Sequence, residues 1–410
     1  MFFNSWTFAA FALVATAAFA IAPARWRAYV LILAGLAFYA EAGPANLAVI
    51  VAAALTTYGV ARLLRATGER SRRYVLAGGG IAALALLLAY CKYARWVSET
   101  AAGALPGWHV PTVGPLVAPL AISFFTFEFI HFVLEVHAGR IKEFTFKQFL
   151  LFALFFPTML AGPIKRYGSF VPQAGALRLA TGAELHAALY RIFVGLFKKV
   201  AIADPASLFA VPIFHPDPSF TARTYAVALV AGSIKVYYDL GGYSDIAIGF
   251  GLLFGVRVPE NFAKPYLSTN LVAFWSRWHM SLTSWVRDYV YVPLARRVRP
   301  PRAPGAARAQ RESAIRPSVL FCMSAVMVVV GIWHGAGWHF FIWGLWNAAC
   351  LAIFHLWRGG VVRHVAWLRR PSPALTVASI LLTYGSFTFG LGWIAAPTTA
   401  DALVIYRSFL

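Results

Sequence analysis

The sequence is poor in charge, and above all in negative charge. Asp and Glu number 15 against 36 Lys and Arg, and all charged residues together make up only 12% of the 410 residues. Soluble domains carry about 25% charged residues, so this composition excludes an ordinary soluble protein. Hydrophobic residues make up 60% of the chain, and the mean hydropathy is +0.67. We therefore interpret the chain as a protein that crosses a membrane several times.

Cysteine is also scarce. The three cysteines, Cys91, Cys322 and Cys350, lie in or beside apolar runs and show no paired spacing. A disulfide framework or a zinc site would need suitably spaced partners. Neither is predicted, and no bound metal is expected.

Alternation of polar and apolar residues is missing from the apolar runs, which are continuous. Lipid admits only helices and closed barrels, and barrel strands alternate, so the barrel is excluded. We predict an all-α, polytopic helical membrane protein, with broken or re-entrant helices around a central funnel or tunnel. One domain over residues 1–410 would hold about ten or more helices, at roughly 20 residues per crossing.

The first apolar run, residues 5–27, is interpreted as a retained first helix and not as a signal peptide, because its basic residues follow the run. The other candidate spans fall near 28–40, 44–64, 74–94, 113–137, 147–162, 185–203, 222–240, 243–256, 271–294, 318–334, 338–357 and 374–396.

Positive charge is grouped between the apolar runs, at 65–73, 165–169 and 296–317. Basic loops of this kind mark the cytoplasmic side and favour anionic lipid headgroups. Segment 296–317 is rich in Pro, Arg and Ala, and we predict a mobile cytoplasmic loop there. No basic groove module with interleaved aromatic residues is visible, so nucleic acid is not an expected partner.

Polar residues interrupt the apolar stretch 113–137, where Glu128, His131 and Glu135 follow Pro115 and Pro119. An irregular backbone at membrane depth is tolerated only where it lines a cavity enclosed by protein. We therefore expect this stretch to be broken or re-entrant, beside a cavity at membrane depth.

His334 lies in the run GIWHGAGWHFFIWGLWNAA, residues 331–349, which contains no acid, Lys or Arg. A polar group in hydrocarbon without a partner costs several kcal/mol, so a histidine there usually lines a cavity, a substrate path or a proton route. Gly331, Gly335, Ala336 and Gly337 would let a backbone or a ligand approach it closely. Two interpretations stay open, a histidine that only joins helices and one that performs chemistry.

Segment 257–298 mixes aromatic residues with charged ones, a pattern typical of the membrane interface, and part of it should lie along the surface. On a helix, His279 would share a face with Thr283. An interfacial histidine without a task is the alternative. Asp239 and Asp245 flank Gly-Gly: they could bind a cation or relay protons, but a helix start after the glycines favours Asp245 as a cap.

Five motifs carry a resemblance: FFPTMLAGPIKRY (155–167), GLFKKVAIAD (195–204), DLGGYSDIAIGFGLLFG (239–255), PENFAKPYLSTNLVAFWSRWHMSLTSWVRDYVYVPL (259–294) and GIWHGAGWHFFIWGLWNA (331–348). In this order they resemble the membrane-bound O-acyltransferase family, and the combination of RWHxSL with a downstream WHG is specific. The chain is similar to the bacterial branch that acylates exported polymers, which includes alginate and peptidoglycan O-acetylation proteins and teichoic-acid D-alanyl transferases.

The resemblance implies that His334 is the catalytic histidine and His279 a second histidine associated with activity. A substrate tunnel would be lined by Trp333, Trp338, Trp278, Trp275, Arg277, Ser281, Asp288 and Asn347. An imidazole is suited to accept the hydroxyl proton in transfer from a thioester, and water-excluding rings would limit hydrolysis.

The resemblance further implies a location in the bacterial cytoplasmic membrane and no permanently bound cofactor. The expected donor is acetyl-CoA or an acyl carrier protein thioester on the cytoplasmic side. The expected acceptor is an extracytoplasmic glycopolymer or a partner acyltransferase. Acetyl is the acyl group expected first, and D-alanyl transfer from a carrier protein to a teichoic-acid-like polymer is the alternative. A proton-coupled transporter or flippase is a third hypothesis, although the internal repeats that transporters often carry are not evident.

Overall fold

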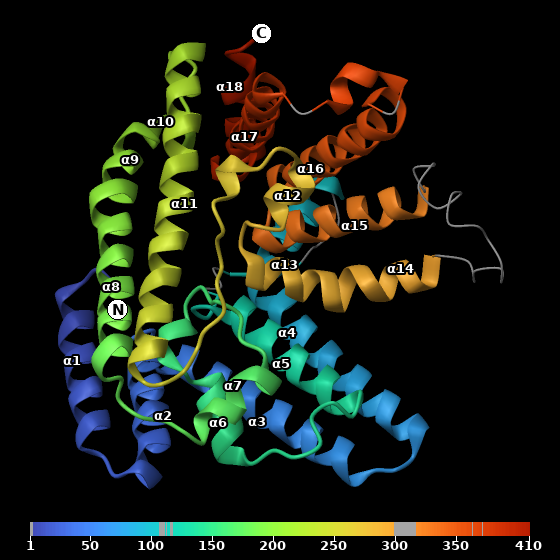
Figure 1. Cartoon of the computed structure of the whole chain (residues 1–410). Coiled ribbons are helices and arrows are strands. Elements are labelled where there is room, and N and C mark those ends of the chain that lie inside the picture. Colours follow the sequence, from blue (N-terminus) through green and yellow to red (C-terminus); the bar gives the residue numbers. More distant parts are fainter. Residues whose placement is uncertain are drawn as a thin grey trace. The chain divides into compact units, whose positions relative to one another are not determined.

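The structure of the protein is a computed structural model, which describes residues 3–105, 111, 113–114, 118–298, 317–362, 364–370 and 372–410. These residues form helices and connecting turns, and no strand occurs among them (Figure 1). The predicted all-α fold is confirmed. The chain divides into two compact units: unit 1 comprises Met1–Ala201 and Tyr238–Glu260, and unit 2 comprises Ile202–Tyr237 and Asn261–Leu410.

Unit 1 is built from the N-terminal helices and the second half of α11. Its elements are α1 (Trp6–Ile21), α2 (Ala24–Ala40), α3 (Pro44–Ala66), α4 (Arg70–Ala104), α5 (Ile122–His137), α6 (Phe146–Ala153), the short 3-10 helix η1 (Phe156–Thr158), α7 (Tyr167–Ala174) and α8 (Gly182–Phe197). The π-helix η2 (Lys198–Ala203) continues α8 and ends in unit 2.

Unit 2 holds the first half of α11 and the C-terminal helices. Its elements are α9 (Asp204–Phe209), α10 (Val211–Phe214), α11 (Ala222–Leu253, shared with unit 1), η3 (Pro265–Leu267), α12 (Leu271–Trp275), α13 (Met280–Val286), η4 (Arg287–Tyr291), α14 (Val292–Val298), α15 (Pro317–His334), α16 (Trp338–Trp357), η6 (Arg358–Val362), η7 (Ala366–Arg369), α17 (Pro373–Ala395) and α18 (Thr399–Arg407).

Five helical runs in the described part of the chain are long and apolar enough to cross a membrane: α3, α4, α15, α16 together with η6, and α17. Other expected spans are shorter helices, of 16 residues in α1 and α5 and 17 in α2. At about 1.5 Å per residue they measure roughly 24–26 Å, less than the hydrocarbon core of about 30 Å. The predicted multi-pass architecture is confirmed, and the shorter helices fit a fold in which several segments do not cross completely.

The core of unit 1 is almost entirely aromatic and aliphatic. Helices α3, α4 and α5 pack against one another, and α2 contacts α6 and η1. Phe129, Phe132 and Phe149 are completely buried. Gly35 of α2 lies so close to the chain leaving α6 that a Cβ atom there would stand 1.9 Å from the Leu154 carbonyl oxygen. Glycine at this point therefore lets two backbones touch.

The stretch 113–137 is interrupted at its beginning and not in its middle. Helix α5 starts only at Ile122 and then runs without a break to His137, so Glu128 and His131 lie on a regular helix. Residues 115–117 of this stretch lie outside the described part of the chain. So do residues 299–316, which make up most of the predicted basic loop 296–317.

Helix α11 corrects the interpretation of Asp245 as a helix cap. The helix continues from Ala222 to Leu253, and Gly241 and Gly242 do not break it. Gly242 instead touches α8, because a Cβ atom there would lie 2.6 Å from the Gly195 carbonyl oxygen. Helix packing therefore explains this glycine, and Asp245 belongs to a helix interior.

Helices α15 and α16 form a closely packed hairpin in unit 2. Gly331 and Gly344 face each other where the two helices meet, and a Cβ atom on Gly331 would lie 2.5 Å from the Phe340 carbonyl oxygen and 2.8 Å from the Gly344 Cα. Larger residues would force the helices apart. The two glycines thus fix the position of the turn between the helices, directly after His334.

Candidate active site

His334 is the last residue of α15, and its side chain is exposed on unit 2. Its ring centre lies 4.8 Å from that of Trp333 and 4.9 Å from that of Trp343 in α16, the latter edge to face. Trp343 is buried. The two indoles fix the side of the hairpin on which the imidazole lies.

The turn after His334 requires glycine. A Cβ atom on Gly335 would lie 2.0 Å from the ring of Phe340, and one on Gly337 would lie 2.4 Å from the ring of His339. Both rings pack onto bare backbone. The close approach predicted for the small residues around His334 is therefore present. The groups that approach are the rings of Phe340 and His339.

His279 stands at the corner between α12 and α13 and is only 8% exposed. Its backbone adopts the left-handed conformation, with φ 44° and ψ 53°. Such a conformation costs a residue with a side chain roughly 1–2 kcal/mol. His279 lies outside the five candidate membrane spans, and burial lowers the pKa of its imidazole to about 4. The ring is therefore neutral at physiological pH.

A continuous series of aromatic contacts joins the two histidines within unit 2. The ring of His279 lies 6.2 Å from Phe262, which lies 5.1 Å from Trp278. From Trp278 the contacts run through Phe274, Trp275 and Trp343 to His334, at 5.6, 5.1, 6.0 and 4.9 Å between ring centres. Each of these side chains is an uncharged ring. The structure thus brings His279 and His334 to one aromatic cluster.

The other residues predicted for the site fall into two groups. Ser281 and Asn347 are buried: Ser281 Oγ donates to Asn261 Oδ1 at 2.9 Å, and Asn347 Nδ2 donates to the Trp343 carbonyl at 2.8 Å. Arg277, Trp338 and Asp288 are exposed. Asp288 pairs with Arg287 at 2.9 Å. The structure therefore buries Ser281 and Asn347 within unit 2 and leaves the other three side chains at the surface of the unit.

Several residues of the cluster could not be selected from sequence. Phe387 of α17 lies 4.7 Å from Phe274 and 4.8 Å from Trp278, and Tyr384, one turn earlier, lies 5.0 Å from Tyr266. They come from a helix more than a hundred residues after the RWHMSL motif. The stretch YGSFTFGLGW, residues 384–393, contains them, but nothing in its composition shows what they contact.

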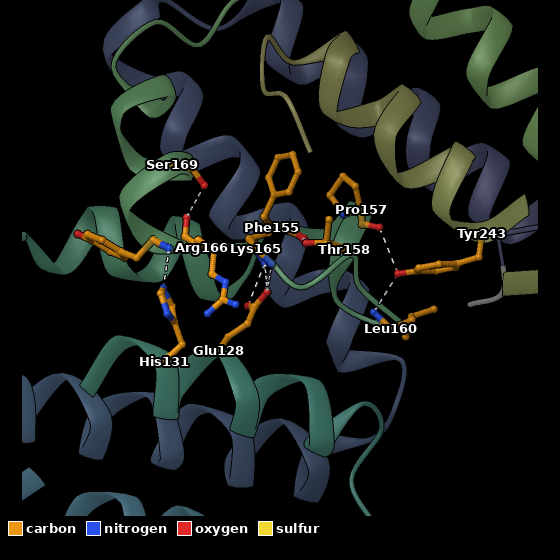
Figure 2. Close-up of polar contacts among 11 residues, drawn as sticks. Glu128, His131, Phe155, Pro157, Thr158, Leu160, Lys165, Arg166, Ser169 and Tyr243 are labelled. Atoms are coloured by element: carbon orange, nitrogen blue, oxygen red, sulfur yellow. Dashed lines mark hydrogen bonds and ion pairs between the residues drawn. The ribbon is translucent and has the colours of Figure 1, made fainter. Parts of the chain in front are cut away.

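A second buried polar cluster lies in unit 1 (Figure 2). Lys165 Nζ donates to both carboxylate oxygens of Glu128, at 2.8 and 2.9 Å, and the Lys165 side chain is 2% exposed. His131, on the same helix as Glu128, accepts a hydrogen bond from the Tyr167 N–H at 2.9 Å through Nε2. The interpretation of 165–169 as an exposed basic loop was wrong for Lys165, which is buried and paired.

Tyr243 holds the first part of segment 155–167, which also contains Lys165. Its hydroxyl donates to the Pro157 carbonyl and accepts from the Leu160 N–H, both at 3.2 Å. Figure 2 shows Glu128 and His131 reaching this segment from one side and Tyr243 from another. Segment 155–167 is thus held to two helices by side chains that satisfy its backbone groups or charges.

The acids of α11 also pair within unit 1. Asp245 contacts Arg191 at 2.7 Å and Lys198 at 2.5 Å, and Asp239 contacts Lys199 at 3.1 Å. Lys198 and Lys199 lie in the π-helix η2. These pairs account for the two carboxylates as partners of basic residues on the neighbouring helix.

Comparison with known proteins identifies what the chain is similar to. Residues 116–304 match the family described as MBOAT, membrane-bound O-acyltransferase. A probable alginate O-acetylase of Azotobacter vinelandii is 32% identical over 81% of this chain and 64% of its own length. The peptidoglycan O-acetyltransferase of Helicobacter pylori is 31% identical over 79% of this chain and 63% of its own length.

The teichoic acid D-alanyltransferase of Bacillus subtilis is 30% identical over 67% of this chain and 68% of its own length. The chain thus spans slightly less than two thirds of the length of the alginate and peptidoglycan proteins. The matched relatives are bacterial.

Proposed function

The chain belongs to the membrane-bound O-acyltransferase family, a family of membrane proteins, and from this premise we propose that it transfers an acyl group from a thioester to a hydroxyl. The observation that carries the proposal is the aromatic cluster of unit 2, in which His279 and His334 are joined by ring contacts. An imidazole packed on uncharged rings is suited to proton transfer, and bound substrates would have to exclude water from the exposed His334.

In the proposed reaction, His334 accepts the proton of the acceptor hydroxyl as its oxygen attacks the thioester carbonyl. A C–O bond forms, the C–S bond breaks, and the thiolate leaves with the proton that His334 returns. A free imidazole has a pKa of about 6.5 and provides general-base catalysis worth about 10²–10⁴-fold in rate. No other group needs to change its covalent state.

His279 would act as a neutral hydrogen-bonding group. Its low pKa makes a cationic role unfavourable at neutral pH. An imidazole N–H is suited to bind the donor carbonyl, where negative charge develops during the attack, or to orient the acceptor. The surrounding tryptophans would exclude the water that would otherwise hydrolyse the thioester.

We propose acetyl as the acyl group, with acetyl-CoA or an acyl carrier protein thioester as the cytoplasmic donor. An extracytoplasmic glycopolymer, or a partner acyltransferase that serves one, would be the acceptor. Support comes from the relatives named for alginate and peptidoglycan O-acetylation, which align with about four fifths of this chain. Their names fit acceptors that are envelope polymers carrying hydroxyl groups.

D-Alanyl transfer from a carrier protein to a teichoic-acid-like polymer is the second candidate. It is favoured by the D-alanyltransferase relative, of which this chain covers 68%. A proton-coupled transporter has less support, because Glu128, Asp239 and Asp245 each form an ion pair with Lys or Arg. Carboxylates held in fixed pairs are poor members of a proton relay.

We further propose that the two substrates meet at His334 from opposite sides of the membrane. Helix α15 has 18 residues, about 27 Å at 1.5 Å per residue. If it crossed upright, its last residue would lie near a membrane surface, since the core is about 30 Å thick. A position of His334 near mid-depth would therefore need α15 to tilt or to begin outside the hydrocarbon core.

Reconstituted vesicles test the proposal. With radiolabelled acetyl-CoA supplied only on the cytoplasmic side, acetyl groups should reach an alginate or peptidoglycan fragment confined to the other side, and His334→Ala should stop the transfer. Transfer only when donor and acceptor share the cytoplasmic side would contradict the cross-membrane route. D-Alanyl transfer from a charged carrier protein, with none from acetyl-CoA, would establish the second candidate.

A further inference from the structure

The first turn of α13 is capped by another segment of the chain. A helix leaves its first N–H groups without intrahelical acceptors, and the residue at the N-cap commonly accepts from one of them through its own side chain. Helices α1, α12, α17 and α18 follow this pattern with Ser5, Asn270, Ser372 and Thr398. At the N-cap of α13 stands His279, and its side chain makes no capping bond.

Asn261 supplies the missing acceptors from 18 positions earlier in the chain. Its carbonyl oxygen accepts from the Met280 N–H at 2.8 Å, and its Oδ1 accepts from the Ser281 N–H at 3.1 Å and the Ser281 hydroxyl at 2.9 Å. Asn261 is 1% exposed. Capping of α13 is therefore performed by a buried side chain of another segment.

The same segment holds the chain on the other side of His279. The Ala263 N–H donates to the Arg277 carbonyl at 3.0 Å. Residues 261–263 therefore bracket His279, with bonds to residue 277 before it and to residues 280 and 281 after it. Between these fixed points the backbone of His279 takes its left-handed conformation, which a side chain disfavours unless the surroundings impose it.

We propose that Asn261 is a positioning residue: it imposes the left-handed conformation on His279 and thereby aims the imidazole at the aromatic cluster. The importance of that direction rests on the proposed acyl transfer. By taking over the capping bonds, Asn261 allows a residue with a chemical task to occupy the N-cap. Asn261→Asp keeps an oxygen at the Oδ1 position, whereas Asn261→Ala removes it.

The first test does not depend on any substrate. In a chain with Cys91, Cys322 and Cys350 replaced by serine or alanine, His279→Cys reports the surroundings of this side chain through its rate of reaction with N-ethylmaleimide. We expect slow labelling when Asn261 is present, labelling several-fold faster with Asn261→Ala, and a rate near the parent's with Asn261→Asp. Thr398→Ala, which removes the cap of α18 in the same unit, should leave the rate unchanged.

Equal labelling rates with Asn261 and with Asn261→Ala would overturn the proposal, and so would acceleration by Thr398→Ala as large as by Asn261→Ala. If Asn261→Ala does not accumulate, Asn261→Leu, which is closer in size to Asn and also lacks an acceptor, takes its place with the same expectation. Since no acyl donor is present, these outcomes stand whether or not the proposed function is correct.

The second test uses a double-mutant cycle on acetyl transfer from acetyl-CoA. Misplacement of a catalytic group by about 1 Å can cost about 10²-fold in rate, so Asn261→Ala should lower kcat by up to that factor, with little change in KM. In the His279→Ala background, the same substitution should have almost no further effect, because there is no imidazole left to position. Equal losses of kcat in both backgrounds would show that Asn261 acts on something other than His279.

Discussion

The buried charges of unit 1 differ from the two histidines of the candidate site in unit 2. In unit 1, Glu128, Lys165 and Asp245 are charged and each is paired within the unit. In unit 2, the buried His279 and the exposed His334 both pack against uncharged rings. A buried pair of opposite charges fixes neighbouring segments, and removal of one partner is costly because the other charge remains buried. A neutral imidazole can accept a proton and return it without such a partner, which suits it for general acid–base chemistry.

The largest expected effect tests the chemical side of this comparison. His334→Ala should lower acyl transfer by about 10²–10⁴-fold, because it removes the general base, while the amount of protein in the membrane stays normal. His186→Ala, at an exposed histidine of α8, is the control and should leave transfer unchanged. Radiolabelled acetyl transfer divided by protein abundance is the measurement. Retention of more than about a tenth of the parent rate would assign His334 a structural role.

The contribution of a buried ion pair to the stability of unit 1 is tested at Lys165. Lys165→Met leaves the Glu128 carboxylate buried without its partner, and we expect a loss of about 3–5 kcal/mol in stability. Glu128→Gln combined with Lys165→Met should recover most of it, because a Gln oxygen can still accept from the backbone N–H of residue 165, which in the parent protein donates to Glu128 Oε1 at 3.2 Å. Thermal unfolding in detergent measures both. A double variant no more stable than Lys165→Met would contradict the role of the ion pair.

The stability of the protein should depend on pH through His279 of unit 2. Burial lowers the pKa of His279 from 6.5 to about 4, so the unfolded chain binds a proton at this residue more readily than the folded protein does. The stability that comes from the neutral ring is therefore complete above pH 6.5 and is lost as the pH falls toward 4, at about 1.4 kcal/mol per pKa unit.

His279→Gln should flatten the stability profile in this window, when it is compared with the parent protein by thermal unfolding between pH 7.5 and 4.5. An unchanged profile would mean that His279 is accessible to protons in the folded state. In that case the contrast between the uncharged aromatic cluster of unit 2 and the buried ion pairs of unit 1 would be weaker than the structure indicates.

The sequence motifs drew attention to the histidines of the candidate site, whereas two buried charges of unit 1 were misinterpreted. The RWHMSL and WHG motifs singled out His279 and His334, and of the predicted tryptophans Trp275, Trp278 and Trp333 belong to the ring contacts between or beside them. Lys165 and Asp245 were misinterpreted because their partners lie 37 and 47 positions away. A lysine beside an arginine resembles a loop residue, and Gly-Gly resembles a helix break, until the packing of another helix is known.

Asn261 and Phe387 could not be found from sequence for a related reason. Asn261 follows a Pro-Glu pair in a segment that reads as a loop, and its role exists only because residues 280 and 281 fold back onto it. Phe387 is one apolar residue in an apolar helix. The pattern of a helix indicates that it packs, but the partner on which it packs is a property of the tertiary fold.

The smallest expected effect tests how much burial contributes to the strength of an ion pair. Arg178 and Glu184 approach to 2.6 Å, as near as the buried pair, but their side chains are 51% and 52% exposed. Water already solvates both charges, and fixing two long side chains costs entropy, so exposed pairs contribute at most about 1 kcal/mol.

Arg178→Met should therefore change the unfolding temperature far less than Lys165→Met, although both replace a cation by the same apolar side chain. Raising the salt concentration should reduce the small effect at Arg178 and leave the large one at Lys165, since buried pairs are screened much less. Equal losses at the two positions would mean that short distance, and not burial, sets the energy, and the contrast between the two units would then lose its physical basis.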